Sequence, residues 1–252
     1  MHIHTEQSDG VLTPEQLVAN LYALKKELLG KDLDLRGFSV CDHQTLTGVP
    51  LIIESLERFE RDNSIAPEHK LRYLVGAEFA FGNYHMTAYF PRIGDESNTD
   101  VYERAISILK PDNIDLIMID EITADKPDKI VDQVHAALGI VGIAHPPKDI
   151  GSKIAPFIKA GIDTIETRNR RFTEVDVQRI LALADTFKLL PTGGSDYHLP
   201  EWGSLVFAPS PTPFSYFEKV EQTANERYRD AVRSIVKADP KRSPPPRRQF
   251  VV

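Results

Sequence analysis

The stretch RGFSVCDHQTLTGVPLIIESLERFERDN, residues 36–63, decides the predicted fold. Its first part is a short apolar run typical of a buried strand, and that run ends in the polar pair Asp42-His43. Its second part spaces apolar residues at helical intervals, which predicts an amphipathic helix. A strand followed directly by a helix is the repeating unit of proteins with a parallel sheet, so recurrence of this unit would predict an α/β fold.

The same unit recurs along most of the chain. The first strand begins at His2, and further strands are predicted over 36–43, 71–81, 84–90, 140–146, 162–169 and 188–198, with 114–120 as a strand or a helical segment. Helices are predicted over 12–30, 49–63, 100–110, 127–139, 153–161, 173–187 and 212–237. This alternation predicts a parallel sheet closed into a barrel, and 252 residues is an ordinary length for such a barrel as a single domain.

Local signals refine this prediction. Thr13 with Gln16 forms a capping-box pattern at the start of the first helix, and Thr173 is placed to cap the helix that follows it. The two strands at 71–81 and 84–90 are expected to turn at Gly82-Asn83. We assign residues 1–235 to the barrel and residues 236–252, which are rich in Pro and Arg, to a loosely ordered tail.

Polar side chains repeatedly follow the predicted strands at the point where each strand ends. In a β/α barrel the C-terminal ends of the strands meet at one face, where active sites form. We therefore expect these side chains to converge, although they are far apart in the sequence. They are Asp42, His43, Glu78, His145, Glu166, Asp196 and His198.

The opening residues HIHTEQSDG add to this set. In an extended strand the side chains of His2 and His4 point to the same face, and Asp9 follows a few residues later. A His-x-His pair alone also fits a surface strand, but here it accompanies many other potential ligands. The nine candidate metal ligands are His2, His4, Asp9, His43, Glu78, His85, His145, Asp196 and His198.

This set predicts metal-dependent hydrolysis. One divalent cation needs about four such ligands, so nine supply more than one, and nitrogen and oxygen donors suit zinc, manganese or iron alike. A site with several metals generates hydroxide at neutral pH and holds an anionic substrate. Arg168 and Arg170 follow Glu166 and are candidates for binding a phosphate, whereas Glu166 is either a site residue or a partner for Arg168.

Composition limits the other possibilities. The formal net charge of −7 argues against nucleic acid as a partner and leaves a small phosphorylated substrate open. The single cysteine, Cys41, allows no disulfide within the chain, and its place in an apolar run predicts a buried residue. No apolar run is long enough to span a membrane and no signal peptide opens the chain, so we expect a cytoplasmic protein.

Taken in order, the motifs resemble those of the PHP-domain family (polymerase and histidinol phosphatase). They are His-x-His with a following Ser-Asp-Gly in HIHTEQSDG, Asp-His in CDH, the glutamate of GAEF, the histidine of IAHP, and the closing SDYH. The match spans residues 2–198. Each motif alone is weak, but the ordered set is specific. Members of this family usually carry a few residues before His-x-His, whereas Met1 directly precedes it here.

The resemblance implies a fold, a metal centre and an activity. The fold would be a distorted (β/α)₇, TIM-like barrel, with two to three divalent metal ions at one face. A hydroxide that bridges metal ions would attack the phosphorus of a small substrate such as a nucleotide or a histidinol-phosphate-like molecule. The residues expected to carry catalysis are Asp9, His43, Glu78, Asp196 and His198.

The resemblance also implies how the ligands divide between the metal ions. The first ion would take His2, His4, Glu78 and Asp196; the second would take Asp9, His43 and His198; the third would share Glu78 and add His85 and His145. Asp42, beside His43, would orient a ligand.

Two other functions stay open. Amidohydrolase barrels also begin with His-x-His and end with a catalytic aspartate, but they cleave C–N or C–O bonds. The contexts SDG and SDYH favour the PHP alternative. A barrel that binds metal without catalysis is the third hypothesis, and the complete set of nine candidate ligands argues against it.

Overall fold

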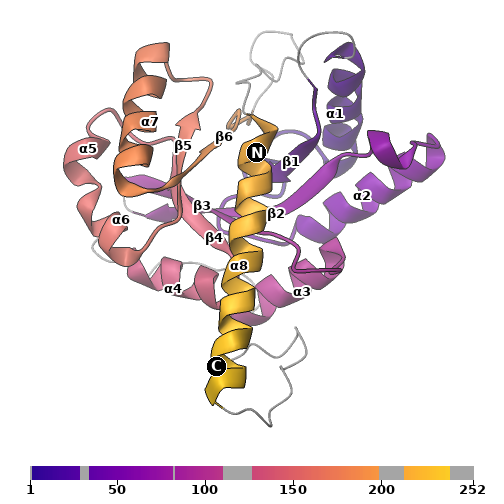
Figure 1. Cartoon of the computed structure of the whole chain (residues 1–252). Helices are drawn as coiled ribbons and strands as arrows, with labels where there is room; N and C mark the ends of the chain where they lie inside the picture. The colour runs from indigo at the N-terminus through magenta and orange to yellow at the C-terminus, as the bar shows by residue number, and fades with distance from the viewer. Residues whose placement is uncertain (1, 29–33, 82, 110–126, 199–212, 239–252) are drawn as a thin grey trace.

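A six-stranded sheet in the order β1-β2-β3-β4-β5-β6 forms the centre of the protein. The structure, a computed structural model, describes residues 2–28, 34–81, 83–109, 127–198 and 213–238 (Figure 1). The strands are β1 Gly37–Val40, β2 Arg72–Phe81, β3 Tyr84–Phe90, β4 Ile140–Ala144, β5 Thr164–Arg168 and β6 Leu190–Gly193. Each of them lies within a stretch that the sequence predicts as a strand.

The sheet is mixed, and not wholly parallel as the sequence predicted. β1 pairs with β2, β4 with β5, and β5 with β6 in parallel, whereas β3 runs antiparallel to both β2 and β4. The predicted hairpin is the cause. Phe81 pairs with Tyr84 across its turn, and so short a connection can join only antiparallel strands.

The sheet curls into a half barrel, and the closed seven-stranded barrel predicted from the sequence is not what the described residues form. Instead of a full first strand, a single residue, Ile3, makes parallel bridges to Val40 at the end of β1 and to Tyr197 beyond β6. The two edges of the sheet are therefore joined at one end only. Gly194 permits this contact, because a Cβ atom there would lie 2.3 Å from Cβ of His2.

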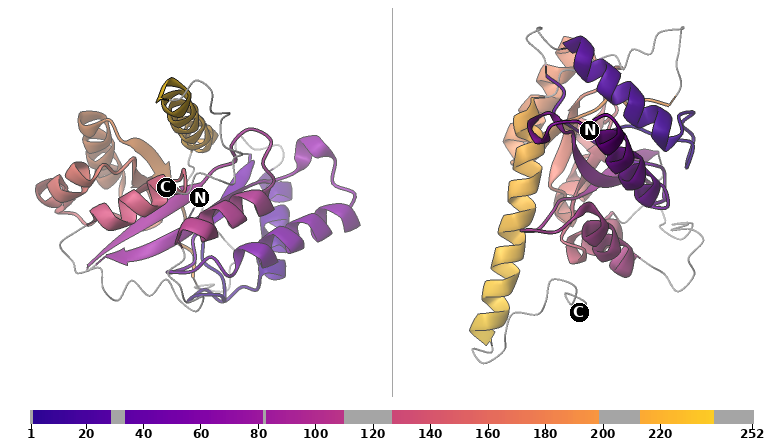
Figure 2. Two further views of the ribbon diagram at one scale, coloured as in Figure 1. Left: turned by 90° about the horizontal axis from the view of Figure 1, so that it is seen from below. Right: turned by 90° about the vertical axis from the view of Figure 1, so that its right-hand side faces the viewer.

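Helices cover both sides of the curled sheet. They are α1 Pro14–Leu28, α2 Val49–Asp62, α3 Asn98–Leu109, α4 Asp128–Ala136, α5 Ile150–Lys153, α6 Ala155–Ala160, α7 Glu174–Phe187 and α8 Phe214–Ala238, with a short 3₁₀ helix η1 at Pro67–His69. α8 lies across one side of the sheet, and the other helices lie around the remaining sides (Figures 1 and 2). The helix predicted over 153–161 is two short helices, which adjoin at Ile154.

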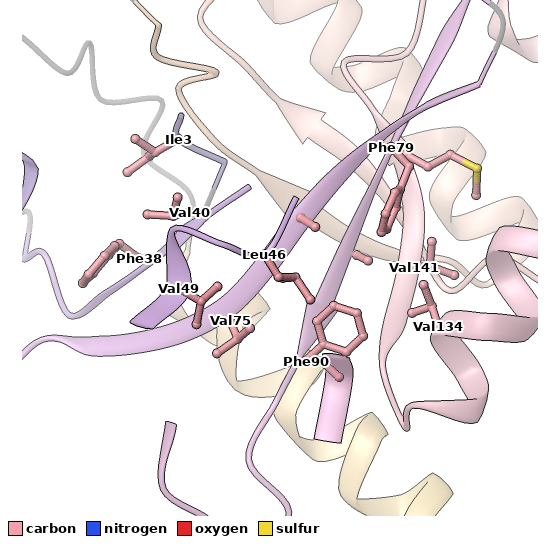
Figure 3. Packing of buried hydrophobic residues seen from close by; sticks show 14 of the residues in the cluster. Ile3, Phe38, Val40, Leu46, Val49, Val75, Phe79, Phe90, Val134 and Val141 are labelled. Carbon is pink, nitrogen blue, oxygen red and sulfur yellow. The ribbon is translucent and has the colours of Figure 1, made fainter. Parts of the chain in front are cut away.

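Two hydrophobic clusters hold these layers together. The larger packs residues of the sheet, such as Val75 and Phe79, against α1 to α7 (Figure 3). Successive side chains of a strand point to opposite faces, so Leu74 lies on the other face of β2 from Val75. There it belongs to the smaller cluster, together with Phe217 of α8. Cys41 belongs to this smaller cluster and is fully buried, which confirms the prediction for it.

The predicted helix caps are confirmed. The backbone N–H of Gln16 donates to Thr13 Oγ1, and Thr13 N–H donates to Gln16 Oε1, at 3.2 and 3.1 Å. Thr173 and Asp176 make the same reciprocal arrangement at the start of α7. Satisfying these free N–H groups fixes where each helix begins.

Some predictions fall outside the described residues. These include Gly82 of the predicted turn, the segment 114–120 and residues 239–252 of the predicted tail. α8 continues through the predicted boundary at residue 235 to Ala238. None of the described helices is long and apolar enough to cross a membrane.

Candidate metal centre

The nine candidate ligands come together at one end of the half barrel. His43 follows β1, His145 follows β4, and Asp196 follows β6, as expected for residues at the C-terminal ends of strands. His85 lies at the start of β3, yet it reaches the same end because β3 runs in the opposite direction and pairs His85 with Ala144. The N-terminal segment enters between the two edges of the sheet, where His4 N–H donates to Tyr197 O at 3.1 Å.

The first group of ligand atoms is fully buried. His2, His4 and Glu78 have an exposed fraction of 0% and Asp196 of 1%. Nε2 of His2 lies 2.9 Å from Nε2 of His4, and these two nitrogens lie 2.9 and 3.1 Å from Glu78 Oε2. Asp196 Oδ1 lies 3.7 and 3.4 Å from the same nitrogens. One donor atom from each residue therefore faces a common point, and these four residues are those implied for the first ion.

The second group lies toward solvent and is built around Asp9. Asp9 Oδ1 lies 3.2 Å from His198 Nε2 and 3.8 Å from His4 Nδ1, and Asp9 Oδ2 lies 3.5 Å from His43 Nε2. The ring of His4 stacks against the rings of both His43 and His198. The structure thus groups His4 with the three residues implied for the second ion.

The third group uses the other oxygen of Glu78. Glu78 Oε1 lies 3.0 Å from both His85 Nδ1 and His145 Nε2, whereas Oε2 faces His2 and His4. His43 also reaches this group, with Nδ1 3.4 Å from Glu78 Oε2. A carboxylate with one oxygen toward each of two ligand groups has the geometry of a bridging ligand.

The electrostatics of the cluster follow from its burial. Burial alone would raise the pKa of Glu78, but the charges and hydrogen bonds of His2, His145 and His4 hold it well below its usual range. Burial alone would lower the pKa of His2, but the carboxylates of Glu78 and Glu166 hold it well above its usual value. Protons on the histidines and a divalent cation therefore compete for the same buried carboxylates.

The donor set fits a divalent metal ion. His2 Nδ1, His4 Nδ1 and Asp196 Oδ1 are buried, and within the described residues they have no hydrogen-bond partner, whereas Asp196 Oδ2 forms an ion pair with Arg171. Buried polar atoms are normally hydrogen-bonded, so this concentration of unpaired atoms needs a reason. Two imidazole nitrogens only 2.9 Å apart beside a carboxylate are arranged to share a cation.

The backbone around the site is held in uncommon conformations. His145 and Asp196 have φ angles of 25° and 50°, which residues other than glycine rarely adopt. Such conformations persist only where surrounding contacts enforce them, and they gather at functional sites.

Asp42 stabilises the loop that carries Asp9. It accepts hydrogen bonds from Thr5 N–H, Thr5 Oγ1 and Ser8 Oγ at 2.6, 2.7 and 3.0 Å. These contacts run to the loop after His4, so Asp42 orders the segment that carries the candidate ligand Asp9.

A hollow of about 360 Å³ opens over the cluster. Its lining includes Arg170 and Arg171, and Arg171 Nη2 lies 2.9 Å from Asp196 Oδ2. Arg168, a predicted substrate-binding residue, is not among the lining residues. The sequence analysis missed Arg171, although β5 ends at Arg168 and the residues after it are the ones that extend over the site.

Glu166 is buried in β5 and belongs to the site. Its Oε1 lies 3.5 Å from His2 Nδ1, and its Oε2 accepts the backbone N–H of His145 at 2.5 Å. The sequence left two roles open for Glu166, a site residue or a partner for Arg168, and these distances support the first.

Comparisons with known proteins support the fold. No family model and no curated protein matches the chain. A protein of Bifidobacterium adolescentis assigned as a metal-dependent phosphoesterase has a similar structure, with a TM-score of 0.56 and 18% identity over 88% of this chain and 94% of that one. An amidohydrolase of Chromobacterium violaceum, solved with sulfate and no metal, is similar with a TM-score of 0.57 and 17% identity over 88% of this chain and 95% of that one. At such identities the likeness establishes a shared fold and no more. On this fold the described residues bring together His, Asp and Glu groups that could hold metal.

Proposed function

We propose that this chain is a metal-dependent phosphoesterase of the PHP type that hydrolyses a small phosphorylated substrate. The observation that carries the proposal is the convergence of all nine candidate ligands below a hollow lined by Arg170 and Arg171. Guanidinium groups match the oxygens of a phosphate with two parallel hydrogen bonds, which suits a phosphate ester better than an uncharged amide.

The cofactors of this proposal are two to three divalent ions, with zinc, manganese and iron all compatible with the donor atoms. His2, His4, Glu78 and Asp196 would hold one ion, and Asp9, His43 and His198 another. Glu78 Oε1 with His85 and His145 would hold a third. Bound together, such ions supply hydroxide at neutral pH and neutralise charge that develops on a phosphate.

The protein side chains supply position and charge. Arg171 is 55% exposed and pairs with the buried Asp196, so its guanidinium can turn from that carboxylate to an incoming phosphate. Asp9, itself 58% exposed, is the acidic residue nearest to solvent in the ligand set and lies within hydrogen-bond range of His198. In this arrangement Asp9 and His198 face the substrate, while Glu78 keeps the two inner groups together.

The experiment that tests the proposal is hydrolysis of an aryl phosphate and a panel of nucleotides, after chelation and again after Mn²⁺ is restored. Phosphate release that chelation removes and Mn²⁺ restores is the expected result. Asp9→Asn should abolish this release, and Asp34→Asn should not. Asp34 is a matched control, because it is also an exposed carboxylate that contacts two basic groups, Lys25 and Arg36. No release from folded, metal-loaded protein would contradict the proposal.

The second candidate function is an amidohydrolase-type reaction. A neighbour with that name matches the fold as well as the phosphoesterase neighbour does. A panel of amides and lactones, assayed with the same metals, separates the two. Turnover of an amide or lactone faster than any phosphate ester, with dependence on Asp9, would favour the amidohydrolase alternative.

A further inference from the structure

Glu166 is a buried carboxylate that lies next to two candidate metal ligands, His2 and His145. It is in the middle of β5, pairs in register with Thr192 of β6, and is 2% exposed. β5 supplies none of the nine candidate ligands, although its neighbours β4 and β6 lead to His145 and Asp196. A buried carboxylate on this strand therefore needs a role of its own, because an isolated buried charge is costly.

The first contact of Glu166 is with His2. Nε2 of His2 faces Glu78, and its other ring nitrogen, Nδ1, faces Glu166 Oε1 at 3.5 Å. Both of these facing atoms are buried, and among the described residues neither has a hydrogen-bond partner. A shift of about 0.5 Å would bring them into the normal N–H···O range. Histidines that bind metals commonly donate their second ring N–H to a carboxylate, which fixes the tautomer and the ring orientation.

The second contact is with the backbone of His145. Glu166 Oε2 accepts the His145 N–H at 2.5 Å and the side-chain amide of Asn169 at 3.3 Å. His145 has a φ angle of 25°, so its backbone conformation must be enforced by contacts of this kind. His145 in turn places its Nε2 on Glu78 Oε1.

We infer that Glu166 is a positioning residue of the metal centre, which fixes the tautomer of His2 through one oxygen and the placement of His145 through the other. This inference rests on the proposed metal centre and adds a residue that the ligand set does not include. It requires His2 to carry its proton on Nδ1 and to offer Nε2 to the metal.

Glu166→Gln separates the two contacts. The amide oxygen can still accept the His145 N–H, but the NH₂ group then faces His2 Nδ1, which must become an acceptor. The His2 proton moves to Nε2 and blocks the nitrogen that faces Glu78. The expected result is a loss of affinity for one metal ion of about 10- to 100-fold, with one equivalent fewer retained after dialysis. Co²⁺ absorption spectra should change in the same variant.

Glu60→Gln is the matched control. Glu60 is also a buried carboxylate, but it accepts from Tyr22 Oη and pairs with Lys70 away from the metal centre. It should retain every metal ion with unchanged affinity. Unchanged metal stoichiometry, affinity and Co²⁺ spectrum in Glu166→Gln would overturn the inference.

Two further outcomes are decisive. If Glu166→Gln does not fold, the ring ¹⁵N shifts of His2 in the Zn²⁺-loaded parent protein replace the test. Protonated Nδ1 with Nε2 on the metal supports the inference, and the reverse tautomer overturns it. A parent protein that binds metals but hydrolyses no phosphate would contradict the proposed function and leave the role of Glu166 intact, whereas a parent that binds no metal would overturn both.

Discussion

Two clusters of histidines and acids lie at opposite ends of the same sheet, and they differ in how completely their polar atoms are paired. At the end away from the metal centre, Asp163 contacts His135 at 2.8 Å, Arg227 at 2.5 Å and the N–H of Val141 at 3.0 Å. At the other end, Asp196 and two histidines keep buried atoms without a hydrogen-bond partner.

The difference separates a structural cluster from a candidate binding site. The carboxylate of Asp163 is already paired with His135 of α4 and Arg227 of α8. This cluster is therefore complete in the folded protein, and it connects α8 to the start of β5. The cluster of candidate ligands has several carboxylates and imidazoles around a common point, and Arg171 pairs with one of them, Asp196. The same residue types therefore serve stability in one place and binding in the other, and each prediction below tests one side of this contrast.

The largest effect is expected from Asp196→Asn. The amide keeps the shape of this buried side chain, which is 1% exposed and lies beside Arg171, so the fold should persist. Turnover should fall by more than about 100-fold, since loss of an outer partner of a ligand alone costs 10–100-fold. Steady-state rates and circular dichroism on the same sample check this. Retention of parental activity would remove Asp196 from the site.

Metal addition should stabilise the protein through the incomplete cluster alone. At a free metal concentration of about 100 times Kd, the free energy of unfolding should rise by roughly 2.7 kcal/mol for one site. Urea titrations with chelator and with Mn²⁺ measure this difference. Asp163→Asn should show the same increase as the parent, and an increase that disappears in this variant would contradict the separation of the two clusters.

Asp163→Asn should lower stability without loss of metal. The amide keeps one acceptor oxygen but loses the charge and the second oxygen, so either Arg227 or His135 and Val141 then face an NH₂ group. The free energy of unfolding should fall by about 1–3 kcal/mol near pH 7. Burial would raise the pKa of Asp163, but hydrogen bonds from His135 and Arg227 outweigh it and lower this pKa. A lowered pKa of an acid contributes stability above its usual value near 3.8, and that stability is lost as the pH falls through the folded pKa. The gap between parent and variant should therefore close below about pH 4, in urea titrations across pH. A gap that widens on acidification would contradict this assignment.

The smallest effect is expected at the mouth of the site. Arg171→Met should raise KM for the phosphate substrate by about 10-fold, the value of one charge-assisted contact, with a smaller change in kcat. Arg168→Met, which replaces the predicted substrate-binding residue that does not line the hollow, should have less effect. Arg233→Met serves as the control, because Arg233 pairs with Asp230 at the far end of α8. An effect of Arg168→Met larger than that of Arg171→Met would restore the original prediction from the sequence.

The sequence predicted which residues come together better than it predicted the sheet that carries them. Candidate ligands such as His43 and His145 could be found because they directly follow predicted strands, whose ends meet at one face. The short connection between the strands at 71–81 and 84–90 did indicate an antiparallel pair, and β2 and β3 form one. The alternation of strands and helices nevertheless led to the expectation of a parallel, closed barrel, because it carries no information on whether the edges of the sheet meet. In the part of the chain that the structure describes, only the isolated bridges of Ile3 connect to the two edges.

Glu166 and Arg171 show a second limit. They are five residues apart in ETRNRR. Glu166 faces His2 inside the site, whereas Arg171 pairs with Asp196 from the solvent side. Alternation along β5 places Glu166 and Arg168 on the same face, but the chain leaves the strand at Arg168, and no periodicity applies beyond that point. Which arginine reaches the hollow depends on the loop, whose path follows from tertiary contacts.

The bridges of Ile3 have a consequence for how the protein is made. His2 and His4 are synthesised long before Tyr197, but they gain their place only when Tyr197 has closed on Ile3. The contact joins residues that are far apart in the sequence, so the entropy of closing this long loop favours its formation late in folding. The proposed metal centre would then be completed late in biogenesis, and a nascent chain stalled before residue 197 would hold most of the candidate ligands but no completed centre.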